Sequence, residues 1–199
     1  ETFNKENVHL IDLHSSPIKR IGKSNIEADQ EYEIDTLILA TGFDAMTGAL
    51  TSLDIIGRKG IVLRDQWNQG AKSYLGLGVS NFPNLFTITG PGSPSVLSNM
   101  MPSIEQHVNW IADCISWMID NDKSVIESSI AAEEEWMNLV NEIAGMTIFK
   151  STESWYNGSN IDSKAKAFLP FIGVPMYTEK LDEITENNYQ GFIFDVSNK

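Results

Sequence analysis

The chain has 199 residues, 42% of them hydrophobic, and carries a formal net charge of −13 at pH 7. A chain of this length can bury a core of its own, but none of its apolar runs reaches the roughly 18 residues that span a membrane. Its acidic balance argues against nucleic acid and anionic membranes as partners, because phosphate groups attract basic surfaces. The single cysteine, Cys114, leaves no disulfide within the chain and fits a reducing cytoplasm, and we expect its thiol to be packed and inert.

The first third of the chain predicts short strands and turns. Residues 7–13 and 17–21 are apolar enough to form two strands, whereas residues 22–30 are polar and typical of a turn. Residues 53–63 predict a hairpin whose tip is the Arg-Lys-Gly sequence. No internal repeat and no low-complexity tract interrupts this pattern, so we expect ordinary globular packing.

Two apolar segments predict buried strands that each end in a turn of small residues. Residues 37–39 are consecutively apolar and lead to Thr41 and Gly42, and residues 85–88 lead to the sequence GPGSP at residues 90–94. If the two strands are neighbours in one sheet, both turns meet at its carboxyl edge, where ligands of open α/β sheets bind. The glycines allow close approach of a ligand, although a purely structural turn explains them equally well.

A helix is predicted after the second turn, with Ser98 or Ser103 as its N-cap. Its apolar residues recur at spacings of three and four, which predicts one buried face, namely Ile104, Val108, Ile111, Ile115 and Met118. A strand, a small-residue turn and a helix aim the positive end of the helix at a bound anion or an electron-rich ring.

A second helix is expected from Ser128 or Ser129 to about Ala144. Trp136 lies on its predicted apolar face. We interpret the three glutamates at residues 133–135 as a solvated first turn that the helix dipole stabilises. A metal site there would need histidine or aspartate partners, which the neighbouring sequence lacks.

The last fifty residues begin with a polar, aperiodic segment at 152–168. It contains Trp155 and is typical of a lid or a binding loop, although a packed anchor is the alternative for this side chain. Residues 178–188 predict a short helix and residues 191–194 an extended segment. The histidines His9, His14 and His107 form no cluster, and we expect each to be structural or exposed. There is no Walker loop and no nucleophile elbow.

Three stretches together resemble the C-terminal portion of Baeyer–Villiger monooxygenases of the cyclohexanone monooxygenase type. They are DTLILATGFD at residues 35–44, GPGSPSVLSNM at residues 90–100 and SWY at residues 154–156. The resemblance covers nearly the whole chain in the family's order. It implies an α/β fold, the C-terminal part of a flavoprotein with Rossmann-like FAD and NADP domains, followed by a helical C-terminal segment.

The resemblance also implies a domain division and an activity. Residues 1–44 would end the NADP domain and return to the FAD domain, and residues 45–122 would be the C-terminal part of the FAD domain. Residues 123–199 would form a helical segment with a mobile active-site loop at about 151–168 and a C-terminal tail. Such enzymes use NADPH, FAD and O2 to convert ketones to esters or lactones through a flavin peroxide. From the single cysteine we expect this chain to be cytoplasmic.

Carried over by position, the resemblance assigns cofactor contacts to five residues. Thr41 and Gly42 would form the turn where the chain passes between the nucleotide domains. Asn99 and Met100 would lie at the flavin ring, near the helix start. Trp155 would lie on the mobile loop that folds over NADP and excludes water from the site.

The resemblance further implies a ketone pocket lined by Met100, Met101, Phe168 and Pro170. Methionine side chains are adaptable and suit varied apolar ketones. No catalytic residue is assigned, because no arginine of this chain corresponds to the one that steadies the flavin peroxide in the family.

The chain lacks features that the family requires. It contains no G-x-G-x-x-G sequence, whereas the family has one for each dinucleotide, and it begins at Glu1 without a methionine. We therefore expect the last two-fifths of an enzyme, whose partner is its own N-terminal remainder. The isolated chain should neither bind FAD tightly nor oxidise a substrate, and apolar strand faces near Ala40 and Ile88 should be exposed.

Two alternatives remain open. A related flavoprotein that oxygenates amines or sulfides has a similar turn at the position of Thr41. A truncated, non-catalytic scaffold or binding module is a hypothesis of another class. Two in-frame glycine-rich fingerprints in the upstream coding sequence would favour the enzyme, and a start codon near Glu1 would favour the scaffold.

Overall fold

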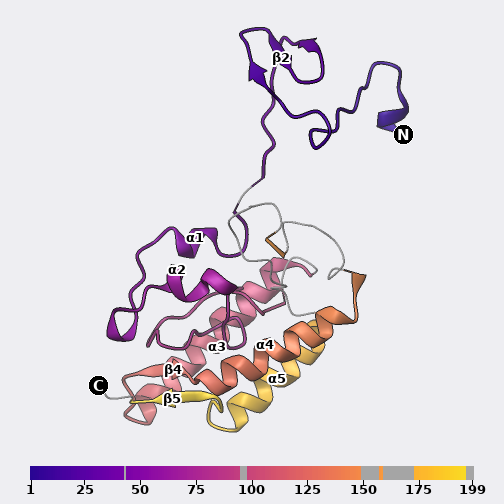
Figure 1. Cartoon of the computed structure of the whole chain (residues 1–199). Helices are drawn as coiled ribbons and strands as arrows, with labels where there is room; N and C mark the ends of the chain where they lie inside the picture. The colour runs from indigo at the N-terminus through magenta and orange to yellow at the C-terminus, as the bar shows by residue number, and fades with distance from the viewer. Residues whose placement is uncertain (43, 95–97, 149–156, 159–172, 196–199) are drawn as a thin grey trace. The chain divides into compact units, whose positions relative to one another are not determined.

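In a computed structural model the chain forms two units, unit 1 over Glu1–Gly42 and unit 2 over Phe43–Lys199. It combines helices with antiparallel strands (Figure 1). The residues that the structure describes are 1–42, 44–94, 98–148, 157–158 and 173–195. None of the described helices combines the length and the apolar character that crossing a lipid bilayer takes.

Unit 1 is built on a small antiparallel sheet with the strand order β1-β2-β3. The strands are β1 (Arg20–Ile21), β2 (Asn25–Glu27) and β3 (Glu31–Glu33), and a 3₁₀ turn spans Thr2–Asn4. Within unit 1 only Ala28 is buried among the described residues. A sheet this small with a single covered side chain has no hydrophobic core of its own.

Several strand predictions for unit 1 were wrong. Residues 7–13 form no strand and Leu10 is 76% exposed, while residues 22–30, interpreted as a turn, contain β2. Residues 37–39 were expected to be a buried strand, yet they pair with no described segment and Ile38 is 82% exposed. A strand must exchange hydrogen bonds with a neighbour, and the described part of the chain supplies none here. The prediction that apolar groups near Ala40 are exposed is confirmed.

Unit 2 is mainly helical. Its long helices are α3 (Met100–Asp120), α4 (Ile130–Gly145) and α5 (Val174–Glu186), and its short ones are α1 (Gly48–Thr51), α2 (Leu63–Gln66) and the 3₁₀ turns Arg58–Gly60 and Trp67–Gln69. Strand β4 (Ile126–Ser128) pairs antiparallel with β5 (Phe192–Phe194), which confirms the extended segment predicted at residues 191–194. Figure 1 shows α3, α4 and α5 packed together, and their shared core includes Trp110, Trp136 and Tyr177.

The helix starts were predicted with mixed success. Ser129 is the N-cap of α4, as expected, and its Oγ accepts a hydrogen bond from the Ala132 amide at 3.1 Å. Helix α5 instead begins at Val174, before the predicted Thr178, because Pro175 fits the first turn of a helix. The Thr178 hydroxyl lies inside the helix and donates to the Val174 carbonyl at 3.0 Å.

The buried face of α3 is not the predicted one. Val108 and Ile115 belong to the predicted stripe, but they are 45% and 44% exposed. The residues that α3 buries are Ser103, His107, Trp110, Cys114 and Met118. Apart from Met118, each lies one residue before a predicted position, which is a rotation of about 100° around the helix axis. The core therefore takes a face that mixes aromatic, polar and apolar residues.

A second, smaller cluster lies under the hairpin at residues 53–63. Ile56 bridges Val62 in antiparallel fashion, which confirms the hairpin. The cluster is formed by Leu63, Trp67, Ala71, Val79 and Phe82. Residues 85–88, predicted as a buried strand, contribute a single bridge, and Ile88 is 47% exposed, as expected near this end.

Candidate functional site

Helix α3 starts in a way that leaves its positive end free of local charge. The N-cap is Asn99, not Ser98 or Ser103, and its Oδ1 accepts a hydrogen bond from the Met101 amide at 3.1 Å. The first turn contains no acidic side chain. The partial positive charge at the start of this 21-residue helix is therefore not neutralised locally and favours an anion or an electron-rich ring.

The start of α3 is also accessible. Asn99 is exposed, Met100 is half-buried and Met101 is 62% exposed. A cavity of about 310 Å³ lies beside it, lined by Ser98, Asn99, Pro102, Ser103, Gln106, Val174 and Thr178. The side-chain amide of Gln106 donates to the Thr178 hydroxyl at 2.9 Å and so links α3 to α5 at this cavity. The lining thus combines hydroxyl and amide groups with apolar surface, to which Pro102 and Val174 contribute.

The glycine-rich turn at residues 90–94 is packed against protein. Gly92 has a φ of +83°, and a Cβ there would lie 3.1 Å from both Met137 Sδ and Trp136 Nε1. Trp136 Nε1 also donates a hydrogen bond to the Gly92 carbonyl at 3.0 Å. Of the two explanations for these glycines, the structure therefore favours close packing of the chain on itself over close approach of a ligand.

His107, expected to be structural or exposed, is fully buried and connects three segments. Its Nδ1 accepts a hydrogen bond from the Thr89 amide at 2.9 Å, and its Nε2 lies 2.8 Å from the Tyr177 hydroxyl. That hydroxyl donates to the Leu75 carbonyl at 2.7 Å. Burial lowers the pKa of His107 to about 4, so the ring is neutral at pH 7. The contacts hold Thr89 just before the glycine-rich turn.

Glu133 is a buried carboxylate that the sequence interpretation missed. It is 4% exposed, and its two oxygens accept hydrogen bonds from the Ser80 amide at 2.8 Å and the Ser80 hydroxyl at 2.9 Å. Burial raises its pKa, an effect that the Ser80 bonds oppose. The prediction of a solvated first turn was wrong here, although Glu134 and Glu135 are exposed. The signal was available, because Glu133 lies three residues before Trp136 on the same helix face.

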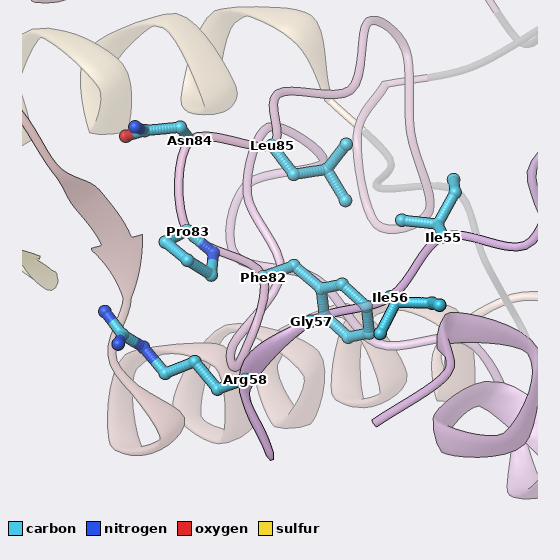
Figure 2. Close-up of a pocket in the computed structure, with 8 residues that line it drawn as sticks. All are labelled: Ile55, Ile56, Gly57, Arg58, Phe82, Pro83, Asn84 and Leu85. Carbon is cyan, nitrogen blue, oxygen red and sulfur yellow. The ribbon is translucent and has the colours of Figure 1, made fainter. Parts of the chain in front are cut away.

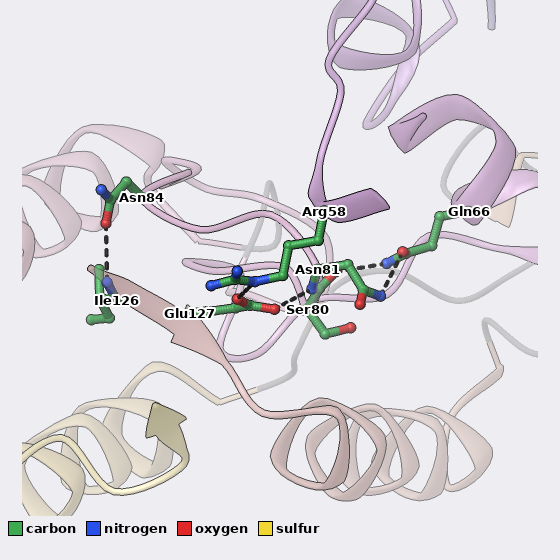
Figure 3. A network of polar contacts seen from close by, with 7 residues as sticks. All are labelled: Arg58, Gln66, Ser80, Asn81, Asn84, Ile126 and Glu127. Atoms are coloured by element: carbon green, nitrogen blue, oxygen red, sulfur yellow. Dashed lines mark hydrogen bonds and ion pairs between the residues drawn. The ribbon is translucent and has the colours of Figure 1, made fainter. Parts of the chain in front are cut away.

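A second carboxylate, Glu127 of β4, anchors the loop that precedes residues 85–88 (Figure 3). It pairs with Arg58 Nε and accepts a hydrogen bond from the Asn81 amide at 2.8 Å. The Asn81 side chain in turn donates to Gln66 Oε1 at 3.0 Å. Arg58 and Glu127 are 14% and 9% exposed, so this ion pair is largely shielded from water. Its role is to hold the loop in place.

A hollow of about 370 Å³ lies next to this network (Figure 2). It is lined by Ile55, Ile56, Gly57, Arg58, Phe82, Pro83, Asn84 and Leu85. The Asn84 side chain points away from the hollow, toward β4, where its Oδ1 accepts a hydrogen bond from the Ile126 amide at 3.0 Å. Because the remaining side chains are largely apolar and Arg58 pairs with Glu127, the hollow offers little to orient a polar ligand.

The site residues inferred from the sequence fall into three groups. Thr41 and Gly42 are exposed at the end of unit 1, and Gly42 has a φ of +84°. Trp155, Phe168 and Pro170 lie outside the described residues. The other three, Asn99, Met100 and Met101, lie together at the accessible start of α3. Cys114 is fully buried and burial raises its pKa to about 12, which confirms an inert thiol.

The sequence resembles those of several named monooxygenases, although no model of a known protein family matches it. It is 37% identical to cyclohexanone 1,2-monooxygenase of an Acinetobacter species over 194 residues. It is 38% identical to a Baeyer-Villiger monooxygenase of Pseudooceanicola batsensis over 198 residues and to phenazine N-monooxygenase of Lysobacter antibioticus over 196. These alignments cover 96 to 98% of this chain but only 35 to 36% of each relative.

Solved structures agree over the same extent. Cyclohexanone monooxygenase from Rhodococcus sp. Phi1 bound to NADP+ superposes with a TM-score of 0.90 at 33% identity, over 98% of this chain and 37% of that one. OTEMO in complex with FAD and NADP gives 0.88 at 34% identity, over 97% and 36%. Sequence and conformation thus coincide along almost the entire chain. The chain belongs to the Baeyer–Villiger monooxygenase family, which includes the cyclohexanone monooxygenases, and spans about a third of the length of its relatives.

Proposed function

We propose that the chain is the C-terminal portion of an FAD- and NADPH-dependent Baeyer–Villiger monooxygenase that converts ketones to esters or lactones. The observation that carries the proposal is the start of α3. Its first turn has no charged side chain, Asn99 caps it, and a cavity lies beside it. It occurs in a chain that matches a relative's complex with FAD and NADP over 97% of its length.

The residues at this helix start fit the ring end of a flavin. Asn99 and Met100 would hold the ring, and the helix N–H groups would stabilise negative charge that develops on it. FAD, when bound, supplies the oxygen chemistry that no side chain can perform. The sequence has no G-x-G-x-x-G to hold a pyrophosphate, so the remainder of the enzyme would bind the rest of each dinucleotide.

The chain would also shape the ketone site and close it. Met101, 62% exposed beside Met100, offers a flexible apolar contact for a ketone, and Phe168 and Pro170 would complete the pocket. Trp155 would cover NADP from its loop and exclude water. We retain the family's assignment of the turn at Thr41 to the passage between the nucleotide domains.

The N-terminal remainder of the enzyme is the proposed partner of this chain. Unit 1 has a single buried residue and exposes Ile38. Apolar groups left in water in this way indicate a surface that another polypeptide segment covers. The relatives are about three times as long as the part that aligns with this chain, so they contain additional polypeptide of this kind.

A second candidate is oxygenation of a nitrogen atom. The 38% identity to phenazine N-monooxygenase equals that to the Baeyer-Villiger monooxygenase of Pseudooceanicola batsensis, so identity does not separate the two substrates. The match over residues 90–101 and the loop that contains Trp155 favour the ketone.

A chimera tests both candidates. This chain replaces the matched segment of the Acinetobacter cyclohexanone monooxygenase, and the product is assayed for bound FAD and for NADPH oxidation with cyclohexanone or phenazine. We expect FAD binding and ketone-dependent formation of a lactone. A chimera that folds and binds FAD but acts only on phenazine would support the second candidate, and one that folds without FAD would contradict the cofactor assignment.

A further inference from the structure

Helix α3 carries a second apolar stripe that the structure leaves at the surface. Val108, Ile115 and Ile119 are 45%, 44% and 69% exposed. Ile104 and Ile111 are half-buried along the same line. At 3.6 residues per turn these five side chains fall within an arc of about 80°. We call this set of five residues the outer stripe.

The outer stripe borders the face that α3 turns to its own core, and only Ile111, at its edge, packs against that core. A surface helix normally has one apolar stripe toward the core and polar residues elsewhere. Here a polar arc with Glu105, Asn109 and Ser116 occupies only part of the exposed surface. Single exposed apolar residues are common, but a contiguous line of them marks an interaction surface.

A second copy of the chain is a poor occupant for the outer stripe. The chain has a net charge of −13. The charged residues of α3 are Glu105, Asp113 and Asp120, all of them acidic. Two outer stripes in contact would bring two acidic helices of two acidic chains together, and like charges oppose such association.

The length of the relatives points to another occupant. The matched structures cover 97 to 98% of this chain but only 36 to 37% of their own chains, at TM-scores of 0.88 to 0.90. This segment therefore has the same conformation in proteins in which almost two-thirds of the polypeptide lies outside it. The outer stripe is apolar and lies on α3, the helix whose start forms the candidate site. The additional polypeptide is therefore the occupant that would cover it.

We propose that the outer stripe is the docking surface of unit 2 for the N-terminal remainder of the enzyme, a partner that the proposed function requires. Docking buries the isoleucine and valine side chains and fixes the axis of α3. Because Asn99 and Met100 belong to the same helix end, this contact would set the position of the cofactor-facing groups.

The test uses capture in the absence of FAD and NADPH. The probe is the part of the Acinetobacter cyclohexanone monooxygenase outside the matched segment, affinity-tagged and co-expressed with this full chain. Val108→Asp combined with Ile115→Asp puts two charges on the outer stripe. Asn109→Asp combined with Ser116→Asp puts the same charges one residue away, on the exposed polar arc. Circular dichroism and thermal unfolding of each chain alone report folding.

We expect the wild-type chain and the polar-arc variant to be captured equally, and the outer-stripe variant at least tenfold less, with unchanged folding of the chain alone. Equal capture of all three chains would overturn the proposal, and so would a failure to capture the wild-type chain. A lowered melting temperature of the outer-stripe variant alone would also overturn it, because the stripe would then belong to the chain's own core. The same holds if the wild-type chain is a dimer and the outer-stripe variant is a monomer. Because capture needs no cofactor, a captured complex that lacks oxygenase activity would count against the proposed function and not against the docking surface.

Discussion

The Nε2 atom of His107 lies 2.8 Å from the hydroxyl oxygen of Tyr177, and both side chains are completely buried. Since Nδ1 accepts from the Thr89 amide, the proton of the neutral ring is assigned to Nε2, which donates to Tyr177. The hydroxyl then donates to the Leu75 carbonyl. Every polar atom of the pair has a partner, as buried groups require, so α3, α5 and two loops are joined without a buried charge.

Replacing Tyr177 by phenylalanine should destabilise the chain by about 3 kcal/mol. The change leaves the His107 N–H and the Leu75 carbonyl unpaired in the core, and each unpaired group costs about 1–3 kcal/mol. Urea unfolding at pH 7 measures the effect. Tyr189→Phe is the control, because Tyr189 is 3% exposed and none of the described residues bonds its hydroxyl. Equal losses for the two variants would contradict the bridging role.

Stability should fall as the pH is lowered from about 6.5 to about 4, in part because of His107. Its pKa is lowered in the folded chain from 6.5 to about 4 by burial, so between these values the unfolded chain binds more protons. The loss reaches about 3 kcal/mol at 1.36 kcal/mol per pH unit. His107→Gln should be less stable at pH 7 but should lack this part of the decline. Parallel stability curves for the two proteins would refute the assignment.

Glu133→Ala should cost about 2–3 kcal/mol, because it leaves the Ser80 amide and hydroxyl without their acceptor. Glu134→Ala, an exposed neighbour, should change stability by less than about 0.5 kcal/mol. Thermal unfolding of both variants at pH 7 provides the comparison.

Glu133→Gln extends this test to pH. Burial raises the pKa of Glu133 above its usual 4.5, so the folded chain binds more protons than the unfolded one just above that pH. The wild type should therefore lose stability as the pH rises through the folded pKa, and the glutamine variant should not. An identical pH profile would show that Glu133 titrates normally.

Gly92→Ala should destabilise the chain by roughly 2–3 kcal/mol, through both its left-handed backbone and the contact with Trp136. Gly60→Ala separates the two effects. Gly60 has a similar φ of +77° but nothing within 4 Å of an added Cβ, so only the backbone cost of about 1 kcal/mol applies. If both variants lose the same stability, the packing around Gly92 is irrelevant.

Asn99 offers a test of the helix start in the chimera. Asn99→Ala removes the N-cap and should cost about 1 kcal/mol. Asn99→Asp keeps the cap but adds a negative charge where we propose that the flavin ring lies, so stability should persist while FAD affinity falls severalfold. FAD fluorescence titration beside thermal unfolding distinguishes the variants. Unchanged FAD affinity in Asn99→Asp would place the ring elsewhere.

The sequence was informative where the signal is local. The N-cap at Ser129, the hairpin at residues 53–63 and the extended segment at 191–194 all follow from short-range rules of capping, turns and alternation. The family resemblance rested on three short stretches in the right order, and it holds for almost the full chain.

Only the tertiary structure decided which groups are buried and why. Periodicity predicted a helix at α3 but selected the stripe with Val108, because two apolar stripes share that helix and only long-range packing chooses between them. In the same way, hydrogen bonds from Ser80 hold Glu133 in its buried position, and the packing of Trp136 leaves little room for a side chain at position 92. Burial depends on which distant segment supplies the partner atoms, and local residue pattern does not contain that information.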